Sequence, residues 1–574
     1  MSARIWIKQS IKKEVSMSAK AVNKPRNGAE LLVQCLEEEG VQYIFGIPGA
    51  KVDTIFDVLA DHGPRLILCR HEQNAAFMAG MVGLLTGTPG VCLVTSGPGV
   101  TNLATGLSTA TCDGYPLVAL GGNVRRGMRH IKTHQSLDNV GVLQSVTKYA
   151  VEIYDGNSIP EVVVNAFRQS EIPPLGASFI SLPQDVLTGA VDAAPIKPTH
   201  SGGPGMFDVQ GLKKAAEIIN NAKMPVIFAG VSAGRKKVMQ ALRDMLNDYP
   251  VPVVNTYQAS GVLSRDLFNC YAGSLGIFQN QPGDKLLQRS DVIITIGFDP
   301  VEYDPEMWNK NMNGMIISID DHTPVIDRYY QPEIELRGDI AANIEELAKH
   351  LKARADDPTA NPLVTEVQEA LLEAKVLGAK QTGFPIHPLR LIFELRNLIG
   401  DDVTVMCDVG SLYVWMARYF NSYEPHRLLF SNGQQTLGVA LPWAIAATLV
   451  RPGEKVISMS GDGGFLFSAM ELETAVREKC SFVHLVWRDG SYDMVKIQQK
   501  LKYGRSFGVD FGQVDIVKYA EAFGATGLRI NKADEIAPVL SKALSLTGPV
   551  LVDVPIDYRD NQNLCATVSE GVGH

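Results

Sequence analysis

The chain has 574 residues, of which 45% are hydrophobic and 20% are charged, the composition of an ordinary globular protein with substantial cores. Its formal net charge of −9 gives no support to nucleic-acid binding or to a polybasic membrane anchor. No apolar run approaches the roughly 20 residues that a membrane-spanning helix requires. At about 150 residues per domain, the length predicts three or four domains.

Residues 1–27 are basic and have no long apolar segment. We expect a flexible N-terminal extension, or a true start at Met17 rather than Met1; a weak targeting peptide is the alternative. The eight cysteines are scattered through apolar segments without a C-x-x-C spacing. This pattern favours reduced core cysteines in a cytoplasmic protein.

After the extension, short apolar strands alternate with helical patterns in three successive blocks. This alternation predicts an α/β fold with three doubly wound parallel-sheet domains. We place them at residues 28–194, 205–350 and 384–560, with a C-terminal tail at 561–574. A Pro- and Gly-rich link precedes the second block. Blocks one and three could share a fold, because both offer a strand, a glycine turn and a helix.

In the first block, an apolar strand at 66–68 leads to Glu72 and then to small and apolar residues typical of a buried helix. Taken alone, a glutamate there is more often an exposed helix-start residue. The second block predicts strands at 225–230, 292–297 and 315–320, followed by a charged helical stretch at 340–380. Its turn at 230–234 is too generic to indicate a dinucleotide site.

The third block carries the sequence Gly461-Asp462-Gly463-Gly464 after a predicted strand at 456–459 and before a helix-like run that includes 470–476. A second strand, at 482–487, delivers Asp489 to the same sheet edge. Two carboxylates and a backbone carbonyl at the ends of adjacent parallel strands suit Mg²⁺ bound to a diphosphate at a helix N-terminus. The alternative is a simple turn with a solvated aspartate.

This spacing resembles the diphosphate-binding motif of thiamine diphosphate (ThDP) enzymes. The resemblance implies that Asp462 and Asp489 are side-chain metal ligands and that Ser491 offers its backbone carbonyl. Arg488 departs from the pattern, since it stands where the family usually has Asn. If Arg488 points away from the ion the site survives, and if it points inward metal affinity is in doubt.

A ThDP enzyme also needs a carboxyl group for the other end of the cofactor, and Glu72 is the candidate. Burial would raise its pKa, so that Glu72 could hold a proton and hydrogen-bond the aminopyrimidine ring. The resulting tautomer of the pyrimidine takes the proton from thiazolium C2. The stretch from Arg70 to Ala79 resembles the glutamate motif of the family.

Further matches at residues 45–51, 95–99, 134–139 and 431–442 make the chain similar to the acetolactate synthase family, and within it to the catabolic, pyruvate-specific, FAD-independent type rather than the biosynthetic type. This resemblance implies a pyrimidine-binding, a central Rossmann-like and a diphosphate-binding domain. It gives Glu72, Lys51 and Gln135 catalytic roles, with Lys51 and Gln135 also holding substrate. Gln498 stands where biosynthetic relatives have tryptophan, so pyruvate is the expected second substrate.

The resemblance also names the cofactor contacts, with Leu437 beneath the folded cofactor. The full set is Glu72, Pro48, Gly49, Gly410, Ser411, Gly433, Gln434, Gln435, Leu437, Gly461, Asp462, Gly463, Gly464, Ser491, Tyr492 and Met494. Without the resemblance, Lys51 would be a surface lysine, Gln135 and Gln498 solvated polar residues, and Leu437 a core leucine.

The expected reaction decarboxylates one pyruvate and joins the hydroxyethyl unit to a second pyruvate, giving 2-acetolactate and CO₂ for the acetoin and butanediol pathway. The expected cofactors are ThDP and Mg²⁺ without FAD, in a dimer of dimers whose sites are shared between subunits. Three alternatives stay open: a pyruvate oxidase or decarboxylase, an NAD(P)-dependent oxidoreductase, and a non-catalytic ThDP-binding protein. Tyr115, where close relatives are expected to have Asp, could alter the pocket.

Overall fold

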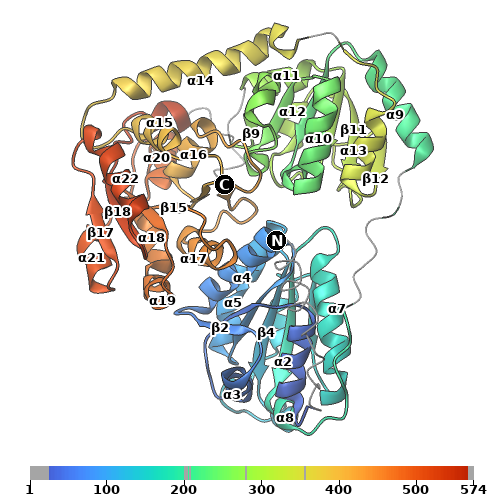
Figure 1. The fold of residues 1–574 in the computed structure, drawn as a ribbon, viewed down its shortest axis with the longest axis vertical. Helices are drawn as coiled ribbons and strands as arrows, with labels where there is room; N and C mark the ends of the chain where they lie inside the picture. The colour runs from blue at the N-terminus through green and yellow to red at the C-terminus, as the bar shows by residue number, and fades with distance from the viewer. Residues whose placement is uncertain (1–24, 199–204, 206–207, 278–280, 355–356, 566–574) are drawn as a thin grey trace, which may run out of the picture.

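Three parallel β-sheets organise the chain, and each has six strands (Figure 1). The computed structural model describes residues 25–198, 205, 208–277, 281–354 and 357–565. Most of the predicted N-terminal extension and of the predicted tail therefore lies outside the described residues. The three sheets confirm the prediction of three doubly wound α/β units.

The N-terminal sheet has the order β2-β1-β3-β4-β6-β5. Its strands are β1 (Tyr43–Gly46), β2 (Arg65–Leu68), β3 (Gly90–Val94), β4 (Leu117–Asn123), β5 (Tyr149–Glu152) and β6 (Ala177–Pro183). Its helices are α2 (Gly28–Glu38), α3 (Asp53–Asp61), α4 (Glu72–Thr86), α5 (Pro98–Cys112), α6 (Asn139–Leu143), α7 (Ile159–Glu171) and α8 (Gln184–Thr188). Glu72 is thus the first residue of α4, as its motif predicts.

The central sheet has the order β12-β11-β10-β7-β8-β9. Its strands are β7 (Pro225–Ala229), β8 (Val253–Thr256), β9 (Tyr271–Leu275), β10 (Val292–Ile296), β11 (Met315–Asp320) and β12 (Ile334–Arg337). Its helices are α9 (Val209–Asn221), α10 (Lys236–Asp248), α11 (Pro282–Arg289), α12 (Pro305–Asn309) and α13 (Ile340–Ala348). The chain starts at β7 in the middle and winds outward in both directions, which is the Rossmann-like arrangement, with its switch point between β7 and β10.

The C-terminal sheet has the order β14-β13-β15-β16-β18-β17, which repeats the strand order of the N-terminal sheet and confirms that the two could share a fold. Its strands are β13 (Thr404–Cys407), β14 (Leu428–Phe430), β15 (Val456–Gly461), β16 (Val483–Arg488), β17 (Thr526–Arg529) and β18 (Val550–Pro555). The helix α14 (Pro362–Lys380) precedes it.

The C-terminal helices that matter most for the site are α16 (Ser411–Tyr419), α17 (Ala440–Val450), α18 (Asp462–Ser468) and α20 (Asp493–Tyr503). The others are α15 (Pro388–Leu398), α19 (Leu472–Arg477), α21 (Ile516–Ala522), α22 (Ile536–Ser545) and α23 (Asn561–Cys565). The predicted helix at 470–476 is interrupted: α18 ends at Ser468, the short 3₁₀ turn η7 (Ala469–Glu471) follows, and α19 then begins.

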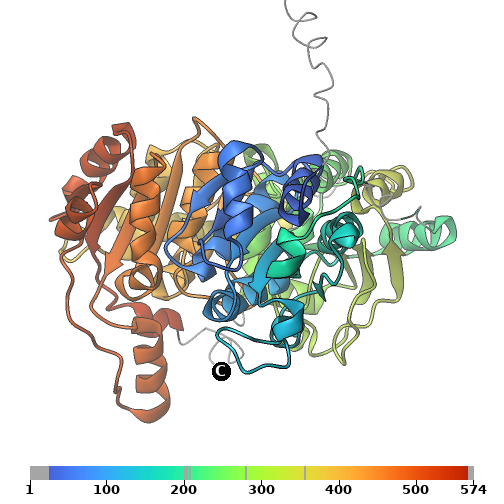
Figure 2. The ribbon, with the colours of Figure 1, turned by 90° about the horizontal axis from the view of Figure 1, so that it is seen from below.

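The N-terminal and C-terminal units pack through α4 and α17, which lie next to each other in Figure 1. Both helices consist largely of small and apolar residues on all sides, because each is covered by its own sheet on one face and by the neighbouring unit on the other. Phe77 and Trp443 belong to one continuous buried cluster that spans the contact. Figure 2, seen from below, shows the N-terminal unit in front of the other two.

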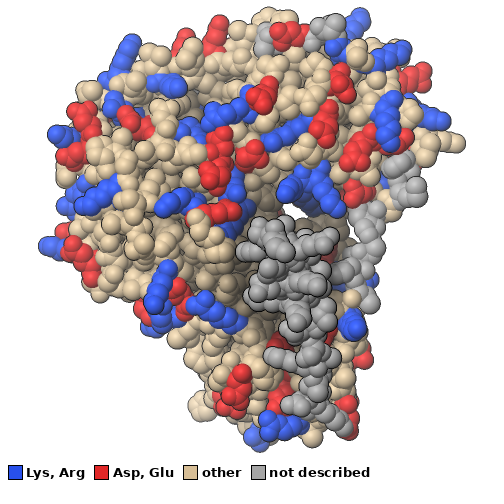
Figure 3. Space-filling view, in the orientation of Figure 1, with Lys and Arg blue, Asp and Glu red and all other residues tan. Residues whose placement is uncertain are grey.

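The surface carries charges of both signs. On the face in Figure 3, Lys and Arg are interspersed with Asp and Glu among the side chains drawn in colour. Within the described part of the chain, no helix is both long enough and apolar enough to cross a membrane.

Candidate active site

The ends of β15 and β16 bring the two predicted metal ligands together. These strands pair in parallel with Gly461 opposite Trp487, so Asp462 and Asp489 both emerge at the carboxyl edge of the sheet. Asp462 is buried, and its Oδ2 accepts a hydrogen bond from the Gly490 amide at 2.8 Å. Its Oδ1 accepts one from the Gly463 amide at 3.1 Å. The carboxylate therefore joins the ends of both strands.

The acidic groups at this edge crowd one another. Burial, together with the nearby carboxylates of Asp462 and Asp493, raises the pKa of Asp489 to about 7, although a hydrogen bond from the Ser491 hydroxyl at 2.5 Å lowers it. Burial likewise raises the pKa of Asp462 and of Asp493. Neighbouring carboxylates repel one another when both are charged, and a bound divalent cation relieves this repulsion. Mg²⁺ prefers oxygen ligands of this kind, so the residues present fit Mg²⁺.

Arg488 points away from this carboxylate pair. Its Nε donates to Asp553 Oδ1 at 2.8 Å and its Nη2 donates to Asp553 Oδ2 at 3.2 Å, across the sheet on β18. Asp489 follows the last residue of β16, and among the described residues the Arg488 guanidinium pairs with Asp553 and Gln513 rather than with Asp489. The departure from the family motif at this position therefore leaves the metal edge free of the guanidinium.

A cavity of about 260 Å³ lies beside the carboxylate pair. The sequence-predicted residues that line it are Gly410, Ser411, Gln435, Leu437, Gly461, Gly463, Gly464, Asp489, Ser491, Tyr492, Met494 and Gln498. The remaining lining residues are Val409, Leu412, Tyr413, Asp493, Val495 and Tyr558. All of these belong to the C-terminal unit, and α20 supplies one wall.

Two glycines of the motif are required by close packing at the cavity. A Cβ on Gly463 would lie 2.8 Å from the Tyr492 ring, and one on Gly464 would lie 3.1 Å from Asp408 Oδ2. Gly410, at the start of α16, has a φ of +136°, which side chains rarely adopt. A side chain at any of these three positions would therefore clash with its neighbours or strain the backbone at the cavity wall.

The loop at 431–438 is held by two buried aspartates, Asp113 and Asp408, that no sequence motif singled out. Asp113, at the end of α5, accepts from the amides of Asn432 at 3.0 Å and Gly433 at 2.7 Å. Asp408 accepts from the Gly438 amide at 2.9 Å through both oxygens. Burial raises the pKa of Asp113 to about 6 and that of Asp408 to about 7. These contacts fix Gln435 and Leu437 at the cavity wall, whereas Gln434 is exposed and donates to Cys112 Sγ.

The N-terminal unit carries the other predicted residues. Glu72 is half-buried in the single chain, less enclosed than its motif predicts, and its Oε2 accepts from Asn102 Nδ2 at 2.9 Å. Gln135 is exposed, has a φ of +59°, and accepts from the Ser96 hydroxyl at 2.9 Å through Oε1, which directs its amide NH₂ outward.

The loop after β1 holds Pro48, Gly49 and Lys51. A Cβ on Gly49 would lie 2.4 Å from Thr95 Cβ, so this loop needs glycine to lie against the end of β3. Lys51 is half-buried beside Gly122, close to the Ser96 backbone. Lys51 and Gln135 thus come from segments that both approach Ser96.

The two groups of predicted residues do not meet within one chain. Glu72 contacts the Asn102 turn of α5, while Thr436, on the loop at 431–438, contacts Thr109 at 2.8 Å. At 1.5 Å per residue these two points are about 10 Å apart along the helix. In the described chain, no lining residue of the C-terminal cavity comes from the N-terminal unit.

Tyr115 lies away from the cavity. It is buried between the units, with its ring edge-on to Trp443 at 6.0 Å and its hydroxyl donating to the Phe430 carbonyl at 3.4 Å. The tyrosine supports β14 rather than the lining of the pocket, and Asp113 provides a carboxylate two residues earlier.

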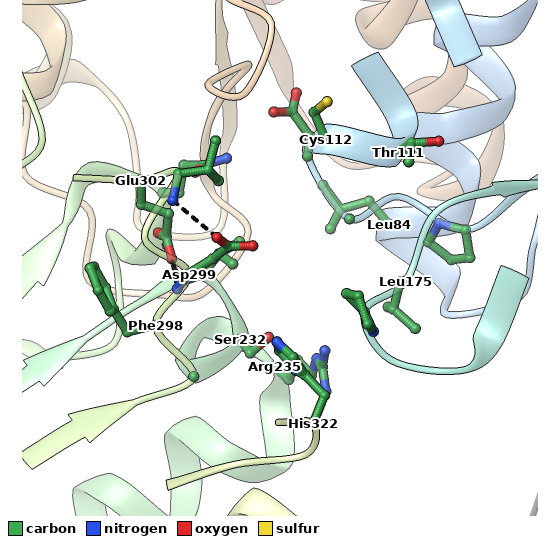
Figure 4. Close-up of a pocket in the computed structure, with 18 of the residues that line it drawn as sticks. Leu84, Thr111, Cys112, Leu175, Ser232, Arg235, Phe298, Asp299, Glu302 and His322 are labelled. Carbon is green, nitrogen blue, oxygen red and sulfur yellow. Dashed lines mark hydrogen bonds between the residues drawn. The ribbon is translucent and has the colours of Figure 1, made fainter. Parts of the chain in front are cut away.

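A second cavity, of about 180 Å³, lies between the N-terminal and central units at the carboxyl ends of β7, β10 and β11. Figure 4 shows Cys112 and Leu175 on one side of it, and Glu302 and Arg235 on the other. The buried Glu302 carboxylate accepts from the Val231 amide at 2.9 Å and from the Asp299 amide at 3.1 Å. In a dinucleotide-binding Rossmann domain the amides of this first turn would meet phosphate. Here a carboxylate of the chain itself takes that position.

Comparison with known proteins agrees with this geometry. Three family models match: the N-terminal TPP binding domain of thiamine pyrophosphate enzymes at residues 26–142, their central domain at 212–347, and their C-terminal TPP binding domain at 408–554. The acetolactate synthase of Bacillus subtilis (strain 168) is 52% identical over 94% of this chain and 95% of its own length. The catabolic acetolactate synthase of Raoultella terrigena is 44% identical over 94% of this chain and 98% of its own. A probable acetolactate synthase large subunit of Methanococcus aeolicus is 32% identical over 92% of each chain. The chain therefore belongs to the acetolactate synthase family of thiamine diphosphate enzymes.

Proposed function

We propose that this protein is a ThDP- and Mg²⁺-dependent acetolactate synthase. It would convert two molecules of pyruvate into one 2-acetolactate and one CO₂, a product that feeds the acetoin and butanediol pathway. The observation that carries the proposal is the C-terminal cavity, which Asp489, Leu437 and Gln498 line together, with Asp462 hydrogen-bonded to the Gly490 amide beside it. The high identity to relatives named acetolactate synthase supports it.

Bound ThDP would supply a nucleophile at thiazolium C2, and its cationic ring would take up the electron pair that the departing CO₂ leaves behind. Asp462, Asp489 and the Ser491 carbonyl would hold Mg²⁺ and through it the diphosphate. Leu437 would support the two rings from below, and the turn at 433–435 would bind the aminopyrimidine. Glu72 would hold a proton at the opposite side of that ring.

The substrate assignment rests on the polar groups around the proposed site. Lys51 supplies a cation for a pyruvate carboxylate, and the outward amide of Gln135 supplies a donor for a carbonyl or carboxylate oxygen. Gln498 lines the cavity without the flat apolar face of the tryptophan expected in biosynthetic relatives. A second pyruvate is therefore favoured over the longer 2-ketobutyrate, which gains from apolar contact.

A homo-oligomer, a dimer further paired into a tetramer, would complete each site by joining the Glu72 side of one subunit to the Asp462 side of another. The separation of the two groups along α5 supports this arrangement. So do the exposed apolar side chains of Leu466 and Phe467 on α18, which are 42% and 47% accessible in the single chain.

Activity without FAD is also proposed. The Glu302 carboxyl group already accepts from the Val231 amide, so this amide is not free to bind a phosphate at that turn. A cytoplasmic location is supported by the cysteines: the seven whose side chains are described are all free thiols.

The test is conversion of pyruvate by protein purified without flavin, with and without ThDP and Mg²⁺. Acetoin after acid treatment, formed only with both cofactors, is the expected result. Acetaldehyde or acetate would assign the chain to the decarboxylases or oxidases of the same family. Bound ThDP with no turnover would indicate a non-catalytic ThDP-binding protein.

A further inference from the structure

Glu471 is a buried carboxylate at the junction of the N-terminal and C-terminal units, in the turn η7 that follows α18. Its Oε1 accepts from the backbone amides of Arg70 at 2.9 Å and His71 at 3.0 Å. The same oxygen accepts from Asn74 Nδ2 at 3.1 Å, and Oε2 accepts from the Thr474 hydroxyl at 2.7 Å. Four donors, three of them from the N-terminal unit, converge on this one side chain.

The three donors from the N-terminal unit lie at or just before the start of α4, the helix that begins with Glu72. Amides at a helix N-terminus have no partner within the helix and carry the positive end of its dipole. His71 caps the Gln73 amide with its own Nδ1 at 3.2 Å, and Glu471 reaches in from the other unit to hold the amides before Glu72. Among the described residues no cationic side chain forms an ion pair with Glu471, so the backbone amides and the helix end supply its stabilisation.

These contacts restrain Glu72. It lies between His71, whose backbone amide donates to Glu471, and Asn74, whose side chain donates to the same carboxylate. Its side chain is restrained separately by Asn102 of α5 at 2.9 Å. The direction of the Glu72 carboxyl group is thus set by one contact on its side chain and by an anchor on its backbone that comes from the diphosphate-binding unit.

We infer that Glu471 is a positioning residue for catalysis: by holding the N-terminus of α4 it fixes the direction in which Glu72 meets the aminopyrimidine of ThDP. This inference rests on the proposed function. The test relies on the difference between a carboxylate and an amide at position 471, because a charged oxygen holds the three donors on Oε1 more strongly than a neutral amide oxygen. A glutamine could keep these donors only by turning its NH₂ group toward the Thr474 hydroxyl, which would then have to accept instead of donate.

The test is Glu471→Gln, with Glu473→Gln as the matched control. Glu473 lies two residues further on, is 38% exposed and pairs with Arg477 on the surface. The first readout needs no cofactor: amide hydrogen exchange at Arg70 and His71 in the cofactor-free protein should accelerate in Glu471→Gln and stay unchanged in Glu473→Gln.

The second readout is deuterium exchange at C2 of bound ThDP, without pyruvate. We expect this rate and kcat to fall about 10–100-fold in Glu471→Gln, as misplacement of a catalytic group does, while the Kd for Mg²⁺–ThDP and the KM for pyruvate change less than about threefold. A merely structural role would instead lower Tm and weaken cofactor binding together. Should Glu471→Gln not fold, Asn74→Ala removes one of the three donors from the N-terminal unit and should show a smaller loss of the same kind.

Unchanged C2 exchange and unchanged amide protection in a folded Glu471→Gln protein would overturn the inference. The proposed function fails separately, since wild-type protein that exchanges C2 but forms no acetolactate would refute the synthase and leave the role of Glu471 testable.

Discussion

Replacing Arg488 with alanine should destabilise the C-terminal unit and leave the metal site intact. Asp553 is fully buried, and Arg488 and Arg529 share its two oxygens. Breaking a buried ion pair costs about 3–5 kcal/mol, and because Arg529 remains we expect about 2 kcal/mol. For a unit of this size that corresponds to a fall in Tm of about 4–8 °C. The Kd for Mg²⁺–ThDP should change less than about threefold, because the guanidinium faces away from Asp489.

Thermal unfolding of the cofactor-free protein and titration with Mg²⁺–ThDP measure the two effects. Lys518→Ala is the control: its side chain is 82% exposed, and its pairing with Asp515 at 3.7 Å should contribute almost nothing. An unchanged Tm in Arg488→Ala would refute the account of Asp553. A loss of Mg²⁺–ThDP affinity above about tenfold would refute the placement of the guanidinium away from the ion.

Three further outcomes are expected. The pKa of an aspartate in the unfolded chain is about 3.8, and burial raises that of folded Asp489 to about 7. The folded cofactor-free protein therefore binds an extra proton between these pH values, and the stability that this proton contributes is lost as the pH rises through 7. Mg²⁺–ThDP, which needs the deprotonated carboxylate, should therefore raise Tm more at pH 8 than at pH 6, and equal shifts would contradict this. Gly433→Ala should weaken ThDP binding, because the new Cβ would lie 2.5 Å from Cys112 Cβ, whereas Gly512→Ala, with nothing within 4 Å, should leave the Kd unchanged. Gln498→Trp should raise the share of the 2-ketobutyrate product about tenfold when both ketoacids are supplied, as measured by product ratio, and an unchanged ratio would show that Gln498 does not select the substrate.

The site residues that the sequence predicts best are those that stand directly at the end of a predicted strand or at the start of a predicted helix. Asp462 and Asp489 could be predicted to lie together because each ends an apolar strand and adjacent parallel strands finish at one edge. The start of α4 at Glu72 follows from the strand before it and the small residues after it. The repeat of one strand order in the first and third units was suggested by the same pattern of strand, turn and helix.

Residues that act across the unit boundary could not be predicted in this way. Glu471 stands in a helix-like run beside Glu473, where a glutamate is ordinarily exposed, and the sequence did not predict the turn η7 in which its side chain is buried. Asp113 ends a helix, where an acidic residue gives no signal of burial, and its partners on the loop at 431–433 are more than 300 residues away in sequence. The direction of Arg488 depends on Asp553, which no local motif connects to it.

Among the described residues, only the C-terminal unit lines the cavity beside Asp489. Two inactive variants, one defective in each unit, should therefore be able to complement each other. Chains with Glu72→Gln would retain an intact diphosphate side, and chains with Asp462→Asn would retain an intact pyrimidine side. Each variant alone would be inactive. Mixed after dissociation, the two variants would pair in the proposed dimer so that one site receives both defects and the other receives neither. With random pairing half of the dimers would be mixed, and one of the two sites in each would be intact, so about a quarter of all sites would regain activity.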